Sequence, residues 1–123
     1  MKLYTDLEQS KKLAEILPIE SADACWTNHL FNFFLSYWRV ESTPPQEYKA
    51  LLDRFVVKGY LIEPCWSLAT LLNVLKDYTL QTNTDGTVFV VCDSKKPMIS
   101  DTYDNSVDAC YELILKLKDR NLL

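Results

Sequence analysis

The end of the chain is the segment that most constrains how the protein can fold. Residues 105–117 have the pattern of a capped amphipathic helix, in which Asn105 or Ser106 can cap the first turn. Apolar residues then recur at helical spacing on one face, at Val107, Cys110, Ile114 and Leu117. Such a helix is stable only when its apolar face packs on another part of the protein. The tail therefore predicts a folded domain with a hydrophobic core.

Capping residues and prolines predict three more helices. Thr5 and Glu8 have the spacing of a capping box, and Pro18 ends the helix that they would begin. Pro44 suits the first turn of the second helix, and Ser67 is the predicted cap of the third. The apolar stripes expected on these last two helices are Tyr48, Leu51, Leu52 and Phe55, and Leu68, Leu71, Leu72 and Leu75.

Short β-rich segments lie between these helices. Strands are predicted at residues 24–26 and 60–62, and residues 78–82 and 87–92 flank an Asp-Gly turn that is typical of a β-hairpin. Residues 98–100 can add a short edge strand. With 123 residues, the chain fits one domain. We therefore predict an α+β fold over residues 1–123, with about four helices packed on a small, mostly antiparallel sheet.

The aromatic segment at residues 30–40 allows two interpretations. Its apolar residues fit one face of a helix, and its aromatic content suits a strand equally well. If the segment is central, the aromatic side chains belong to the core. If they are partly exposed, they form an interaction surface for a protein partner or a second copy of the chain. The residues of this predicted surface are Phe31, Phe33, Phe34, Tyr37 and Trp38.

Cys65 is the sharpest candidate for a catalytic residue. It lies just before a predicted helix, where the positive end of the helix dipole lowers the pKa of a thiol. Cys65, Trp66 and Ser67 follow one another as around the nucleophile of papain-like proteases, but those enzymes place their histidine after the cysteine, and His29 precedes it. Two alternatives stay open: Cys65 fills the junction between strand and helix, or it is a nucleophile that uses His29 as its base.

Metal and cofactor sites have little support in the sequence. The four cysteines are widely spaced, the chain has one histidine, and two glycines cannot build a phosphate-binding loop. Acidic residues recur at three- and four-residue intervals near the last helix. They can bind a hard cation, or they can stabilise the helix because their negative charge lies at the positive end of its dipole. They are Asp101, Asp104, Asp108 and Glu112. We favour the helix interpretation and expect neither a metal nor a cofactor.

Charge and hydropathy narrow the partners and the compartment. The net charge is −4, and lysines and arginines form no cluster that would follow a phosphate backbone, so nucleic-acid binding is not expected. No stretch approaches the ~20 apolar residues of a membrane span. Because no export signal is visible and no cysteines are closely paired, we expect a cytoplasmic protein with reduced thiols.

Three blocks of sequence carry a resemblance to a known group of proteins. They are residues 4–13 with 21–23, residues 64–72 and residues 105–114. Together they resemble a family of small uncharacterised proteins from gut anaerobic bacteria, often encoded in phage-like or mobile elements. The segment at residues 27–58 has no counterpart in this resemblance. The family has no established activity, so the resemblance implies a bacterial or phage accessory protein and assigns no functional residue.

The sequence thus favours an accessory or protein-interaction domain, with a homodimer as one form of interaction. The alternative is a small thiol-dependent enzyme that uses Cys65 and His29. An enzyme requires these two side chains to lie within hydrogen-bond reach in a pocket. An interaction domain requires a contiguous apolar surface instead.

Overall fold

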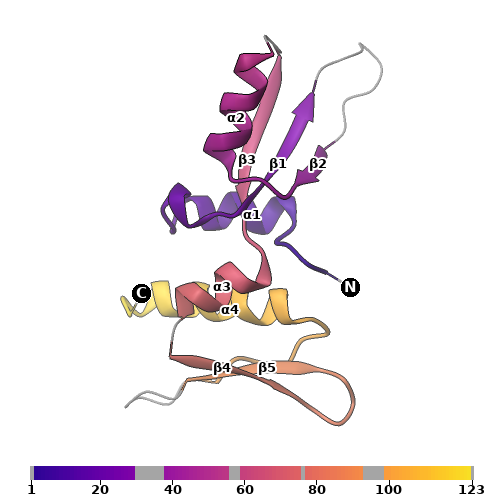
Figure 1. Cartoon of the computed structure of the whole chain (residues 1–123). Helices are drawn as coiled ribbons and strands as arrows, with labels where there is room; N and C mark the ends of the chain where they lie inside the picture. Colours follow the sequence, from indigo (N-terminus) through magenta and orange to yellow (C-terminus); the bar gives the residue numbers. More distant parts are fainter. Residues whose placement is uncertain (1, 30–37, 56–58, 76, 93–98, 123) are drawn as a thin grey trace. The chain divides into compact units, whose positions relative to one another are not determined.

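The structure, a computed structural model, describes residues 2–29, 38–55, 59–75, 77–92 and 99–122. Over these residues it contains four α-helices, one 3-10 helix and five strands, which confirms the α+β class and the four predicted helices (Figure 1). The strands form two antiparallel sheets rather than one. The chain divides into two compact units, residues 6–67 and residues 1–5 with 68–123. The assignment of residues 1–123 to a single domain stays a prediction.

The unit of residues 6–67 is built on a three-stranded sheet with the order β2-β1-β3. Its central strand β1 is antiparallel to both neighbours, so the predicted strands near residues 24 and 60 are confirmed and are longer than expected. In chain order its elements are α1 (Leu7–Ala14), a 3-10 helix (Ile19–Ser21), β1 (Ala24–His29), β2 (Trp38–Glu41), α2 (Pro45–Arg54) and β3 (Tyr60–Cys65).

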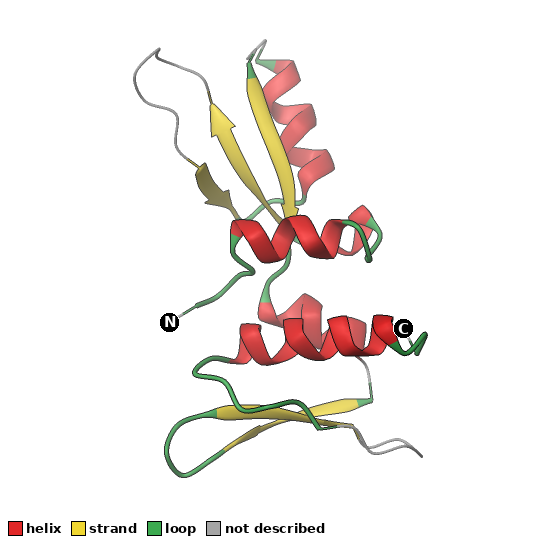
Figure 2. Ribbon diagram, turned by 180° about the vertical axis from the view of Figure 1, so that it is seen from behind, coloured by secondary structure: helices red, strands yellow, loops and turns green. Residues whose placement is uncertain are grey.

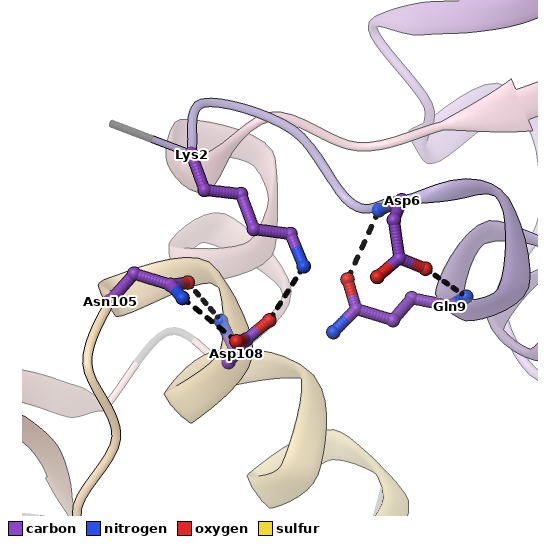
Figure 3. Close-up of polar contacts among 5 residues, drawn as sticks. All are labelled: Lys2, Asp6, Gln9, Asn105 and Asp108. Carbon is purple, nitrogen blue, oxygen red and sulfur yellow. Dashed lines mark hydrogen bonds and ion pairs between the residues drawn. The ribbon is translucent and has the colours of Figure 1, made fainter.

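The first helix begins one residue later than the sequence suggests. Asp6, and not Thr5, is its N-cap: the Asp6 carboxylate accepts a hydrogen bond from the Gln9 N–H at 2.8 Å (Figure 3). In return, the Gln9 side chain accepts from the Asp6 N–H at 3.1 Å. Asp-x-x-Gln and Thr-x-x-Glu are overlapping capping boxes, and the two hydrogen bonds between Asp6 and Gln9 show that the first of them forms.

The second helix packs through a narrower stripe than predicted. Pro44, predicted in its first turn, is its N-cap, and Pro45 occupies the first turn; Pro45 and Leu52 are buried. Tyr48 lies between them on the same face and is half-buried. Leu51 and Phe55 are exposed, however, with 44% and 69% of their surface accessible. The prediction that these two face the core is therefore wrong, because a helix of ten residues on a small sheet buries positions i, i+3 and i+7 but leaves the flanking positions open.

In the second unit, α4 (Ser106–Asp119) packs against a β-hairpin, and α3 (Leu68–Leu75) packs against α4. The core of this unit includes Leu71, Val90, Val107, Leu113 and Ile114, all fully buried. The predicted apolar face of the last helix is confirmed, since its four residues are all buried. The elements are α3 (Leu68–Leu75), β4 (Tyr78–Thr82), β5 (Val88–Cys92) and α4 (Ser106–Asp119).

The hairpin turn explains why a glycine occupies position 86. The Asn83 N–H donates to the Thr87 carbonyl at 2.7 Å, and the Gly86 N–H donates to the Asn83 carbonyl at 3.1 Å. Gly86 has φ +88°, the left-handed conformation that closes a three-residue loop of this kind. The predicted hairpin is thus confirmed. Residues 99 and 100 also lie beside β5, where the Ser100 N–H donates to the Val90 carbonyl at 3.0 Å.

Candidate functional site

One face of the three-stranded sheet is covered by α2. Residues that face each other in antiparallel strands project to the same side, so Cys25, Thr27 and Ile62 share this face with Tyr60. Cys25 and Thr27 are fully buried there. The Tyr60 hydroxyl donates a hydrogen bond to the carboxylate of Asp53 in α2. This side of the sheet is therefore part of the core.

The other face of the same sheet is partly accessible among the described residues: Leu61 is exposed, Asn28 is buried, and the residues around them are half-buried. In one row across the strands, Asn28 lies between Trp38 and Leu61. In the next row on this face, Trp26 lies between Val40 and Glu63. Leu61 is 55% exposed, and the two tryptophans are half-buried. We call this surface the open face and define it as Trp26, Asn28, Trp38, Val40, Leu61 and Glu63.

Helix α1 limits the open face at one end of the strands. Ala24 and Cys65 face each other on the same side of the sheet as Trp26, but both are fully buried. Figure 2 shows α1 crossing this end of the sheet, and α1 packs against β3. Leu13 of α1 is fully buried as well. The open face thus begins beyond α1 and is supported from behind by α2.

The structure does not bring Cys65 and His29 together. Cys65 pairs with Ala24 at one end of β1, whereas His29 pairs with Tyr60 at the other end. The two positions are five residue steps apart along β1, which is about 17 Å along the sheet. The register thus places the backbones of Cys65 and His29 at opposite ends of β1. In addition, Cys65 is fully buried. The geometry required for a Cys65–His29 pair is absent between these two positions.

Burial keeps two other thiols protonated. The pKa of Cys25 is raised to about 12, mainly because the thiol is buried, with smaller contributions from the negative charge of Glu41 and from nearby Cys65. Burial alone raises the pKa of Cys110 to about 12. A thiol with so high a pKa is a poor nucleophile at neutral pH. Among the three cysteines whose side chains the structure describes, none forms a disulfide.

Residues after Cys65, at the end of β3, contact the segment that precedes β1. The Trp66 indole is fully buried and donates to the Ser21 hydroxyl at 2.9 Å. The carboxylate of Asp23 accepts from the N–H of Ser67 at 2.9 Å and from its hydroxyl at 2.5 Å. The blocks at residues 21–23 and 64–72 are therefore in direct contact. This packing agrees with the interpretation that Cys65 and Trp66 fill a structural junction.

The aromatic surface predicted from the sequence is only partly visible. Phe31, Phe33, Phe34 and Tyr37 lie outside the described residues, so the choice between helix and strand stays open for them. Trp38 begins β2 and is a member of the open face. Sequence reasoning missed Trp26 and Leu61. The alternation of side chains along residues 24–29 indicates which face of the strand Trp26 lies on, but only the strand register shows that Leu61 lies near it on the same face.

Two of the acidic residues near the last helix, Asp101 and Asp108, make polar contacts at that helix. Asn105 caps α4 by accepting from the Asp108 N–H at 2.9 Å (Figure 3). The Asp108 carboxylate accepts from Lys2 at 2.8 Å and from the Asn105 amide at 2.7 Å. Asp101 lies 3.5 Å from Lys116. Within the described part of the chain, no group of three or more histidine, cysteine or acidic side chains could hold a metal ion.

Comparison of the chain with protein-family models, curated proteins and solved structures finds no match in any of the three. Among the helices described, none has the length and apolar character needed to cross a membrane. The candidate site therefore depends on the geometry of the open face alone.

Proposed function

We propose that this protein is a non-catalytic interaction domain that binds a protein partner through the open face. The observation that carries the proposal is the row of Trp38, Asn28 and Leu61 beside Trp26, on a sheet face that α1 covers only at one end. Tryptophans that are partly accessible on a rigid sheet provide large contact area at low entropic cost. They are frequent anchors of protein interfaces.

The chemistry of the open face favours a particular kind of partner. Trp26, Trp38, Val40 and Leu61 offer apolar area. Glu63 adds a carboxylate next to Trp26 in the same row. An acidic group beside aromatic rings suits lysine or arginine, which can pair with the carboxylate and stack on the ring. We therefore propose an apolar protein segment that carries a basic residue.

We place this interaction in the cytoplasm of a bacterial or phage-infected cell. Buried, protonated thiols at Cys25 and Cys110 are in keeping with a reducing compartment. The resemblance to small accessory proteins of gut anaerobes supports the same setting. An accessory protein of this type acts by holding a partner, and the open face supplies a surface for that purpose.

A photo-crosslinking experiment tests the proposal. A photoreactive amino acid replaces Leu61 on the open face, and, as a matched control, Leu51 on α2, which is 44% exposed. We expect one protein to be captured from position 61 and not from position 51. The variant Glu63→Lys should abolish that capture, while Glu47→Lys on α2 should leave it unchanged. Equal capture from both positions, or capture that survives Glu63→Lys, would contradict the proposal.

A further inference from the structure

Strand β4 pairs with β5 along one of its two edges. Along its other edge, no strand among the described residues pairs with it. The turn bond from the Asn83 N–H to Thr87 sets which β4 residues bond to β5. Because hydrogen-bonded pairs alternate in antiparallel strands, Gln81 and Thr79 direct their backbone groups at β5. Leu80 and Thr82 therefore present their N–H and C=O groups at the outer edge.

The opposite side of β5 supports this assignment. The Val88 N–H and C=O both bond to Tyr103, and the Val90 carbonyl accepts from Ser100. The backbone groups of Val88 and Val90 thus point away from β4, as the alternation requires. Their β4 partners, Thr82 and Leu80, consequently have outward-facing backbone groups.

The β4 edge lacks the features by which proteins normally protect a sheet edge. Its five residues, Tyr-Thr-Leu-Gln-Thr, include no charge and no proline. The edge strands of the other sheet do carry charged residues or proline: β2 has Arg39 and Glu41, and β3 has Glu63 and Pro64. Charged side chains and proline are the common means of preventing edge-to-edge association. The β4 edge is therefore open to pairing with another strand.

The sequence of β4 is complementary to itself in an antiparallel pair. If a two-fold axis passes beside Leu80, this residue faces its own copy, and position 78 faces position 82 of the copy. Each of these three pairs exchanges two backbone hydrogen bonds, so the edge would form about six. On the other side of the sheet, Thr79 faces Gln81 of the copy. At the axis Leu80 thus opposes Leu80, and on the other side polar residues oppose each other at positions 79 and 81.

Burial and charge agree with the same arrangement. Leu80 is half-buried and pairs with Val90, which is fully buried beneath α4. A second Leu80 would continue the apolar layer across the axis. Asp77, the exposed charged residue next to β4, would face Asn83 of the copy, so no like charges meet. These features favour a second copy over an unrelated peptide, for which the pattern would have no reason to be symmetric.

We propose that the protein forms a two-fold homodimer in which two β4 strands pair antiparallel, centred on Leu80, into one continuous sheet. This inference rests on the proposed interaction role and extends it by naming one partner, a second copy of the chain. The surface lies on a different element from the open face. A five-residue strand pair is a small interface, so the dimer is weak and reversible.

Charge pairs at positions 79 and 81 test the register. Thr79 and Gln81 are both exposed, so lysine or glutamate at these positions should leave the fold intact. The variant T79K/Q81K places lysine opposite lysine twice in the dimer. The matched variant T79K/Q81E places lysine opposite glutamate twice. Cross-strand charge pairs of this kind should raise the dimer dissociation constant about tenfold in the first variant and leave it equal or lower in the second.

The measurement is sedimentation equilibrium over a wide concentration range, with circular dichroism to confirm that each variant is folded. Wild-type protein that stays monomeric at the highest concentration would overturn the proposal. Equal weakening by both variants would overturn the register and thus the proposal. Because the test does not touch the open face, a monomeric protein that is still captured from position 61 would contradict the dimer alone. A dimer that captures nothing from position 61 would contradict the proposed function alone.

Discussion

The contact between Asp23 and Ser67 should be a measurable part of the stability of the chain. The Asp23 carboxylate accepts two hydrogen bonds from Ser67, one from its N–H at 2.9 Å and one from its hydroxyl at 2.5 Å. Hydrogen bonds to a charged group contribute about 1.5–3 kcal/mol each when protected from water. Asp23 is half-buried, and the two bonds share one carboxylate, so their contributions are not additive. We expect Asp23→Ala to lower the free energy of unfolding by about 2–3 kcal/mol.

A double-mutant cycle isolates this contact from other effects of the two changes. Ser67→Ala removes the hydroxyl bond and keeps the backbone bond, so it should cost about 1 kcal/mol in the wild-type background. In the Asp23→Ala background the hydroxyl has lost this acceptor, and the cost of Ser67→Ala should fall by roughly the energy of that bond. Urea unfolding followed by tryptophan fluorescence measures each corner, since Trp66 is buried next to Ser67.

Additive effects of Asp23→Ala and Ser67→Ala on the free energy of unfolding would refute this role of Asp23. If Ser67→Ala costs the same in both backgrounds, within about 0.3–0.5 kcal/mol, the carboxylate does not hold Ser67. Asp23→Asn serves as the isosteric control, because it keeps one acceptor oxygen and removes the charge. Asp23→Asn should lower the free energy of unfolding, but by less than Asp23→Ala does. A cost above that of Asp23→Ala would also contradict the account.

Three other changes give expected outcomes on the same stability assay. Gly86→Ala should cost about 1 kcal/mol because an L residue is strained at φ +88°, although the space around the position is open; Gly86→Asn should cost less. Asn105→Ala removes the cap of α4 and should cost about 1 kcal/mol, whereas Asn105→Ser should retain most of the stability. Burial raises the pKa of Cys110 from 9.0 to about 12 in the folded protein. The stability that the buried, protonated thiol contributes is therefore complete below pH 9 and is lost as the pH rises towards 12. In Cys110→Ala the alkaline decline should therefore be shallower by about 1.4 kcal/mol per pH unit, and an unchanged slope would contradict this burial.

Local signals predicted the elements that depend on neighbouring residues. The α4 helix carries its cap at Asn105 and its apolar face within one stretch of chain, and the hairpin carries its turn glycine at position 86. Both were predictable because the residues that stabilise them are close in sequence. The start of α1 was misplaced by one residue because two overlapping capping boxes satisfy the same pattern, and only the hydrogen bonds between Asp6 and Gln9 decide between them.

Features that depend on pairing between distant segments were not predictable. The open face joins Trp26, Trp38 and Leu61, which come from three strands and meet only through the register of β1 with its two neighbours. The same register separates Cys65 from His29, although their residue types suggested a catalytic pair. The alternation of residues along one strand shows which side chains share a face, but it does not show which side a helix covers. That information resides in the packing of α1 and α2.

Thiol alkylation tests most directly whether this protein works by binding rather than by thiol chemistry. The rate of reaction of each cysteine with a small alkylating reagent is measured on native protein between about pH 5 and 9, spanning the ordinary thiol pKa of about 8.5. Because Cys65 is fully buried and lies about 17 Å along the sheet from His29, we expect slow alkylation of Cys65 at every pH, limited by opening of the fold. A fast-reacting thiolate at Cys65 that titrates well below pH 8.5 would contradict the account and restore the enzyme hypothesis.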